Sequence, residues 1–254
     1  MRVRRGSDDV EADVYFDRHG RVTLVKAEDG GTSRSLEGWL DGAEARVRIW
    51  YDQSGKGIIL EPPSHAEQGI LEGDHVLINQ GQWYETMRFK NMNDVFQSGF
   101  TFYISQAVDH SKSSRATSGF GVFNTNPHPR LYIEAKSTSE IQVGIDSSSP
   151  SNSVPTYGEY DKKSYYMIGR DGTVKVFMDD YEVFSRSGSI GRQVDRFSLG
   201  SLADAQRDFT DANNGYKIDP SSSNFLQFIG KMYGALLFDR GVDETVMKQI
   251  HDML

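Results

Sequence analysis

Apolar and polar residues alternate in short runs along most of the chain, as they do in half-buried β-strands. The runs lie at 46–51, 100–105, 131–135, 141–145 and 174–178, separated by clusters of Gly, Asn, Asp and Ser. Asp171-Gly172 suits a tight hairpin turn, and Asp179-Asp180 marks a second reversal of the chain. Such alternation predicts an antiparallel sheet with one face toward water. The chain is therefore predicted to be mostly β.

A helical pattern is found at 241–254. Its apolar positions fall on one helix face: Val242, Val246, Met247, Ile250 and Leu254. Asp243 and Glu244 stand in the first turn, where the helix dipole favours acids. We therefore predict a short C-terminal helix that packs on the β body.

Polar segments rich in Ser, Asn and Gly predict loops at 111–118, 146–155 and 203–224. The third segment exceeds the usual loop length, so it is either functional or ordered by a partner. No linker separates two independent hydrophobic cores. Residues 1–254 are thus predicted to form one domain, in which 1–35 are a candidate peripheral N-terminal hairpin.

Composition and charge narrow the classes of partner. The 254 residues hold 28 Lys+Arg against 36 Asp+Glu, a net charge of −8, which argues against a nucleic-acid partner. No apolar run approaches the length of about 20 residues that a membrane helix needs. No signal peptide is visible in the first residues, and the absence of cysteine excludes disulfides and thiolate chemistry.

Two N-terminal segments carry a resemblance to a known superfamily. RVRRGSDDVEADVYFD at 2–17 and VRIWYDQSGKG at 47–57 resemble the paired signature of concanavalin-like jelly-roll domains of bacterial and phage proteins, and of the catalytic domain of fungal α-L-arabinofuranosidase B. Segments 164–184, 196–200 and 228–250 are similar to the laminin-G-like pattern of the same superfamily. The resemblance implies a two-sheet antiparallel jelly-roll sandwich. Lys56 departs from it, since an Asn is more usual there.

The resemblance does not extend to catalytic carboxylates. Related glucanases carry a Glu-x-Asp-x-x-Glu strand, which is absent here, and the Asn-Ala-Glu segment of the arabinofuranosidase has no counterpart at 118–146. Its Gly-Gly-Asp-Asn segment meets only Leu199-Gly200-Ser201-Leu202. The acids Asp179, Asp180 and Glu182 fall in a predicted turn, where solvated acids are common. No catalytic residue is predicted, and the chain is expected not to be an enzyme.

Metal-binding patterns are weak. The six histidines lack the spacing of metal ligands. Asp8, Asp9 and Asp13, together with Asp52, could group around calcium, while the alternative is that Asp52 and Ser54 cap the turn after a strand. No other cofactor is predicted and no metal site is assigned.

Aromatic residues give the better indication of function. The chain has 12 Tyr, several of them beside polar loop residues, and exposed rings stack on sugars. The alternative is that Tyr is simply a good half-buried strand residue. The candidate ligand-binding residues are Asp204, Arg207 and Tyr216 in the long loop, with Tyr160 from a neighbouring loop.

These features favour a non-catalytic carbohydrate-recognition or adhesion module, part of the fibre, spike or tail of a phage or phage-like particle, that contacts host surface glycan. The alternatives are a glycoside hydrolase related to α-L-arabinofuranosidase and a purely structural virion subunit. We expect a location in a virion or extracellular particle and contacts with other particle subunits. Residues 2–17 are predicted to be an edge strand that pairs with another chain, as in a homo-oligomer. Arg2, Arg4 and Arg5 are predicted to pair with acids such as Asp8 or Glu11.

Overall fold

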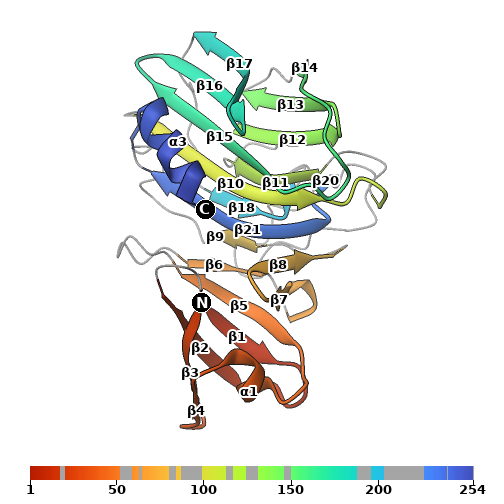
Figure 1. Cartoon of the computed structure of the whole chain (residues 1–254), viewed down its shortest axis with the longest axis vertical. Helices are drawn as coiled ribbons and strands as arrows, with labels where there is room; N and C mark the ends of the chain where they lie inside the picture. The colour runs from red at the N-terminus through yellow and green to blue at the C-terminus, as the bar shows by residue number, and fades with distance from the viewer. Residues whose placement is uncertain are drawn as a thin grey trace, which may run out of the picture.

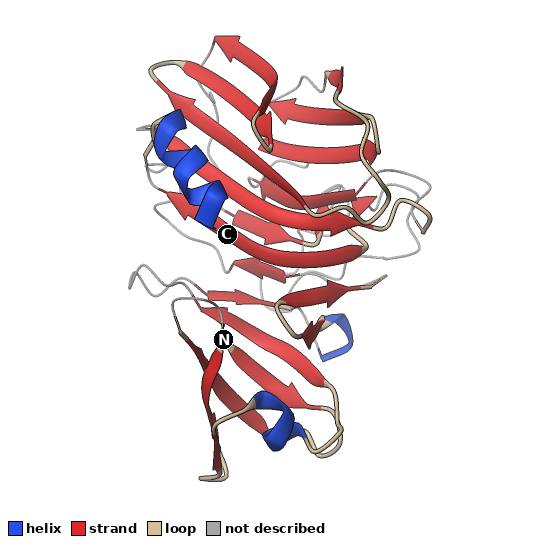
Figure 2. Ribbon diagram, in the orientation of Figure 1, coloured by secondary structure: helices blue, strands red, loops and turns tan. Residues whose placement is uncertain are grey.

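The computed structural model describes residues 1–17, 21–51, 59–62, 65–79, 84–86, 99–112, 117–123, 131–145, 150–187, 196–202, 226–238 and 240–253. This part of the chain is mostly antiparallel β structure (Figure 2). It also contains helices α1 (Leu36–Leu40) and α3 (Glu244–Met253) and the 3₁₀ turn η1 (His65–Glu67). The predicted all-β sandwich with a short C-terminal helix is confirmed, whereas α1 was not expected.

The strands are β1 (Arg2–Arg5), β2 (Glu11–Phe16), β3 (Val22–Ala27), β4 (Thr32–Ser33), β5 (Ala45–Tyr51), β6 (Ile59–Glu61), β7 (Ile70–Glu72), β8 (His75–Ile78), β9 (Tyr84–Thr86), β10 (Phe100–Val108), β11 (Thr117–Phe123), β12 (Leu131–Ser137), β13 (Glu140–Ile145), β14 (Ser151–Ser153), β15 (Lys163–Arg170), β16 (Thr173–Met178), β17 (Tyr181–Ser187), β18 (Arg196–Leu199), β19 (Ser201–Leu202), β20 (Leu226–Gln227) and β21 (Gly230–Phe238). Figure 1 shows their arrangement.

Two sheets share strand β5. The long sheet has the order β4-β3-β2-β1-β5-β7-β8-β21-β10-β15-β16-β17. The short sheet has the order β5-β6-β9-β18-β11-β12-β13-β14. Arg46 of β5 pairs with β7 in the long sheet, while Trp50 and Tyr51 pair with β6 in the short sheet. β5 therefore joins the N-terminal strands to both layers of the sandwich (Figure 1).

The hydrophobic core lies between the two sheets and continues into the N-terminal strands. The long sheet contributes Phe102, Ile104, Tyr165, Met167 and Val176, and the short sheet contributes Ile133, Ile141, Val143 and Leu199, all of them buried. In the N-terminal part, Trp39 of α1 belongs to the same apolar cluster as Val14 and Val47. Burial of this apolar surface is the main favourable contribution to folding.

The outer face of the long sheet is covered by α3. Every residue of β10 is buried, so the predicted wet face is wrong for this strand. Tyr103, Tyr166 and Phe177 pack there with Met247 of the helix. Val246, predicted to face the sheet, is instead 43% exposed.

The N-terminal strands correct one expectation. β1 pairs with β2 on one side and β5 on the other, and β2 also pairs with β3. Residues 2–17 are therefore not an edge strand that another chain must cover. Residues 1–35 contribute the four strands β1 to β4 to the long sheet and share its core. The division of the chain into domains stays a prediction.

The observed turns agree with those predicted from the sequence, whereas two of the predicted loops contain strand residues. Asp171 and Gly172 have φ values of 50° and 70°, as the predicted hairpin requires, and Asp179 has a φ of 51° at the next reversal. The predicted loop at 146–155 contains the short strand β14, and β11 already begins at Thr117. The segment 203–224 lies outside the described residues.

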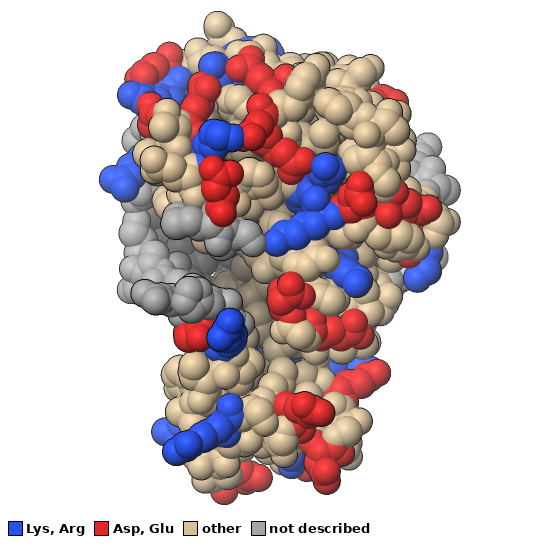
Figure 3. Space-filling model, viewed as in Figure 1, with Lys and Arg blue, Asp and Glu red and all other residues tan. Residues whose placement is uncertain are grey.

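The described surface shows acidic and basic side chains interspersed rather than a single basic patch (Figure 3). This distribution fits the net negative charge of the chain. Among the described residues, neither helix has both the length and the apolar character that crossing a bilayer requires.

Candidate functional site

A β-bulge in β5 places polar residues at the junction of the two sheets. Val3 of β1 pairs with Val47, but the preceding Arg2 pairs with Ile49, so Arg48 is the extra residue of the bulge. A bulge changes the alternation of a strand and redirects a side chain. Trp50 thus packs against the core while Tyr51 donates a hydrogen bond from its hydroxyl to Asp13 Oδ1 at 2.9 Å. The alternation predicted from Val47 to Tyr51 is therefore interrupted.

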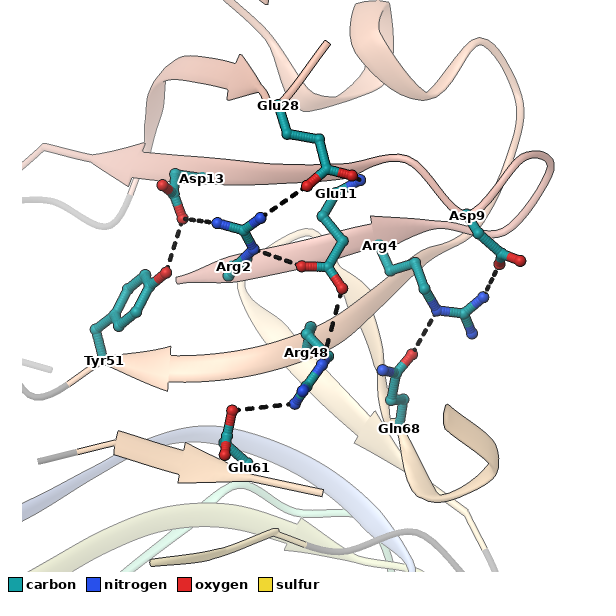
Figure 4. Close-up of polar contacts among 10 residues, drawn as sticks. All are labelled: Arg2, Arg4, Asp9, Glu11, Asp13, Glu28, Arg48, Tyr51, Glu61 and Gln68. Atoms are coloured by element: carbon teal, nitrogen blue, oxygen red, sulfur yellow. Dashed lines mark hydrogen bonds and ion pairs between the residues drawn. The ribbon is translucent and has the colours of Figure 1, made fainter. Parts of the chain in front are cut away.

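A chain of alternating charges runs from the end of β3 to β6 (Figure 4). Arg2 donates from Nε to Glu11 Oε2 at 2.5 Å and from Nη2 to Glu28 Oε2 at 3.0 Å. Arg48 continues the chain, with Nε 3.8 Å from Glu11 Oε1 and Nη1 donating to Glu61 Oε1 at 3.2 Å. The side chains of Arg48 and Glu61 are only 29% and 25% exposed. Solvent and salt therefore screen this pair less than a fully exposed one.

Basic residues of β1 have acidic or amide partners, as predicted. Arg5 pairs with Asp8 at 2.6 Å, and Arg4, which is buried, donates from Nε to Gln68 Oε1 at 2.9 Å and also pairs with Asp9. The hydrogen bond to Glu11 raises the pKa of Arg2. This strand is therefore held by specific polar contacts.

A row of directly opposed residues crosses the short sheet. In order it contains Gly144 on β13, Tyr132 on β12, Gly121 on β11, Ser198 on β18, Glu85 on β9 and Glu61 on β6. Opposed positions in an antiparallel sheet share one face. Leu60, next to Glu61, packs against the core, so the row belongs to the outer face. We call this face the acid-row face.

The acid-row face brings two glutamates together at one end. Glu61 and Glu85 are directly opposed on neighbouring strands. Opposed Cβ atoms lie about 4.5–5.5 Å apart, and retaining glycosidases hold their two carboxyl groups about 5–5.5 Å apart. The register therefore places two glutamate positions opposite each other, and side chains that start at such a spacing can bring their carboxyl groups to the separation used by these enzymes.

Sequence patterns did not reveal this pair because its members lie on different strands. A search for two acids along one strand misses acids that only the register brings together. One signal was available: Glu61 follows Ile59 and Leu60, and Glu85 follows Trp83 and Tyr84. A single acid next to large apolar residues in a strand is unusual, because strands are poor in acidic residues.

The opposite end of the acid-row face is closely packed. The ring of Tyr132 lies against Gly144, where a Cβ atom would come within 1.8 Å of Tyr132 Cε1. Glu134, two residues along β12, is also buried, and Gln142 is its partner in the register. Gly121 and Ser198 stand between this end and the acid pair.

Of the residues predicted to bind a ligand, Tyr160 lies within the described residues, on the loop between β14 and β15 and not on a strand of the acid row. Tyr160 is 49% exposed, and its hydroxyl lies 3.4 Å from Ser111 Oγ. Asp204, Arg207 and Tyr216 lie outside the described residues. Among the turn acids, Asp179 pairs with Lys163 at 2.9 Å.

The acids of the predicted turn, and the described aspartates considered as calcium ligands, form ion pairs or hydrogen bonds with other side chains. Glu182 pairs with Lys175 at 3.4 Å, and Asp180 pairs with Lys248. Asp8, Asp9 and Asp13 contact Arg5, Arg4 and Tyr51, respectively. Within the described ranges no group of three or more His, Cys, Asp or Glu is arranged to hold a metal ion. Asp52 and Ser54 lie outside these ranges, and a calcium site stays a prediction.

The fold is similar to that of solved glycoside hydrolases. An arabinofuranosidase complexed with arabinofuranosyl-α-1,2-xylobiose has a TM-score of 0.66 at 12% identity, over 99% of this chain and 57% of that one. An α-L-arabinofuranosidase mutant soaked with 4-nitrophenyl α-L-arabinofuranoside has a TM-score of 0.63 at 13% identity, over 99% and 58%. Trypanosoma rangeli sialidase in complex with sialic acid has a TM-score of 0.60 at 10% identity, over 81% and 31%. No protein-family model and no curated protein matches the sequence.

These likenesses establish the fold, a β-sandwich, and the chain spans less than two thirds of each of these proteins. They correct two expectations. The chain was predicted to be a non-catalytic module of a phage particle and not an enzyme, whereas these similar structures are sialidase and arabinofuranosidase. The expectation rested on the absence of two acids along one strand, and that absence says nothing of acids that lie opposed on different strands. Nothing in these structures supports the phage setting.

Proposed function

We propose that the chain is a glycoside hydrolase domain that uses Glu61 and Glu85 as its pair of acids. The observation that carries the proposal is their opposed register on β6 and β9. In this reaction Glu85 gives a proton to the leaving oxygen as the glycosidic C–O bond breaks, and the Glu61 carboxylate attacks the anomeric carbon. Water then cleaves the glycosyl–Glu61 bond, and Glu85 recovers its proton from that water.

We assign the roles of the two acids from the arginine that contacts Glu61. Arg48 donates a hydrogen bond to Glu61 Oε1 at 3.2 Å, and this charge-assisted contact orients the Glu61 carboxyl group. Glu61 is therefore proposed as the nucleophile and Glu85 as the acid.

A neutral arabinofuranosyl substrate fits the charge of the region better than an anionic sugar. Acids outnumber arginines in the chain of charges that leads to Glu61. The carboxylate of sialic acid would be repelled by this excess and by the net charge of −8. The arabinofuranosidase likeness also extends over almost the whole chain. We therefore propose α-L-arabinofuranosyl side chains of a polysaccharide as the substrate.

Hydrolysis of 4-nitrophenyl α-L-arabinofuranoside and of arabinoxylan tests this function. We expect wild-type turnover and a loss of about 10²–10⁴-fold in kcat for Glu61→Gln and Glu85→Gln. Glu182→Gln is the matched control, because Glu182 is an exposed, ion-paired strand glutamate far from the acid row. An inactive wild-type protein, or full activity in both site variants, would refute the proposal.

Further contacts to the polysaccharide are proposed outside the acid row. Tyr160 is half-exposed and offers a ring face to a sugar. Together with Asp204, Arg207 and Tyr216 it is proposed to bind parts of the polysaccharide away from the cleaved bond. Tyr160→Ala is expected to weaken binding of arabinoxylan but not turnover of the aryl glycoside. A location in a virion or extracellular particle stays a prediction.

A further inference from the structure

We infer that Arg48 is a positioning residue for Glu61, placed by the bulge in β5. The inference rests on the proposed function and adds a residue from a different strand to the site. Within the paired stretch from Ala45 to Ile49, Arg48 is the residue that the register leaves without an opposed partner on β1. Bulges frequently redirect a side chain next to a functional site. Here the redirected guanidinium reaches β6 (Figure 4).

Arg48 is itself held in place by the N-terminal strands. Its Nε lies 3.8 Å from Glu11 Oε1, and Glu11 accepts a hydrogen bond from Arg2 at 2.5 Å. Arg2 is in turn bonded to Glu28. The three inner charges of this series, Arg2, Glu11 and Arg48, each have an opposite charge on both sides, which restricts the rotamers of these long side chains. The N-terminal strands therefore fix the position of the Arg48 guanidinium.

The guanidinium then fixes the Glu61 carboxylate. Nη1 donates to Glu61 Oε1 at 3.2 Å in a partly buried position. A nucleophile must be held close to its productive position, and a misplacement of about 1 Å can reduce the rate about 10²-fold. Lysine offers a single point charge instead of a planar fork, so it replaces arginine only in part. Arg48 therefore acts on the reaction through Glu61 and not through the sugar.

Kinetics of Arg48→Gln, Arg48→Lys and Arg46→Gln test the inference. Arg46 is the matched control on the same strand, because its ion pair within the described residues is with Glu44 and not with Glu61. We expect kcat to fall about 10²-fold in Arg48→Gln with KM unchanged, an intermediate value in Arg48→Lys, and wild-type kinetics in Arg46→Gln. A rise in KM alone, or unchanged kcat in Arg48→Gln, would overturn the inference.

A crystal structure of Arg48→Gln gives a readout that does not depend on activity. We expect the Glu61 carboxylate to leave its wild-type position or to occupy more than one rotamer. An unmoved Glu61 would overturn the positioning role even in an active enzyme. The two failures can be distinguished. If the proposed function is wrong, the wild-type protein is inactive but Glu61 still moves in Arg48→Gln; if only the positioning role is wrong, the wild-type protein is active and Glu61 stays in place.

Discussion

The two outer faces of the sandwich are built from similar antiparallel strands but have opposite chemistry. The outer face of the long sheet carries Tyr103, Tyr166 and Phe177 and is closed by α3. The acid-row face of the short sheet instead carries the opposed pair Glu61 and Glu85. An apolar face covered by its own helix serves stability. The polar face is therefore the one on which we place function.

The largest effect on stability is expected at the covered face. Met247 of α3 is fully buried between the helix and the sheet. Met247→Ala should reduce the free energy of unfolding by about 2–5 kcal/mol, because it leaves a cavity under the helix. Urea unfolding measures the change, with the exposed Val246→Ala as control.

Enzymatic activity of the same Met247→Ala variant tests whether the two outer faces have separate roles. The turnover of folded Met247→Ala should equal that of wild type, because the helix lies on the other sheet. A loss of kcat as large as that of Glu61→Gln would break the distinction between the faces.

A smaller effect is expected at the packed end of the acid-row face. A methyl group at Gly144 would collide with the ring of Tyr132. Gly144→Ala should therefore destabilise the protein by about 1–3 kcal/mol through overpacking. Thermal unfolding checks this, with Gly234→Ala as control, since a Cβ there meets no atom within 4 Å. Equal stability of both variants would show that the Tyr132 ring is free to move.

Structural features that depend on neighbouring residues in the chain could be predicted from the sequence. Asp171-Gly172 predicted a turn correctly because the φ values that the turn needs are properties of those two residues. The burial of β10 on both faces was not predictable, because α3 lies more than a hundred residues later in the chain. The bulge at Arg48 likewise depends on how β1 pairs with β5.

The candidate site was less predictable than the fold for the same reason. Glu61 and Glu85 have no fixed spacing that marks them as a pair, and only the register of β6 and β9 opposes them. The pairing of Arg2 with Glu11 could be anticipated, since both lie in one hairpin. Its continuation through Arg48 to Glu61 joins strands that the sequence alone does not bring together.

The smallest effect is expected in the pH dependence of stability and concerns His110, two residues after the end of β10. Burial lowers the pKa of His110, whose Nε2 lies 3.4 Å from the Tyr157 hydroxyl. The folded protein therefore binds a proton at His110 less readily than the unfolded chain. The stability that this group contributes is present above its ordinary pKa of about 6.5 and is lost as the pH falls through the lowered value.

Thermal unfolding at pH 7, 6 and 5 tests this dependence. We expect Tm to fall less for His110→Gln than for wild type over this range. His65→Gln is the control, because His65 is exposed. Identical pH profiles for His110→Gln and wild type would contradict the assignment.

The most direct test of the central claim is a crystal structure of Glu61→Gln soaked with arabinofuranosyl-xylobiose. We expect the arabinofuranosyl ring to lie on the acid-row face, with its anomeric carbon beside the side chain at position 61 and its glycosidic oxygen beside Glu85. A sugar bound only at Tyr160 or over α3, with the acid row empty, would contradict it.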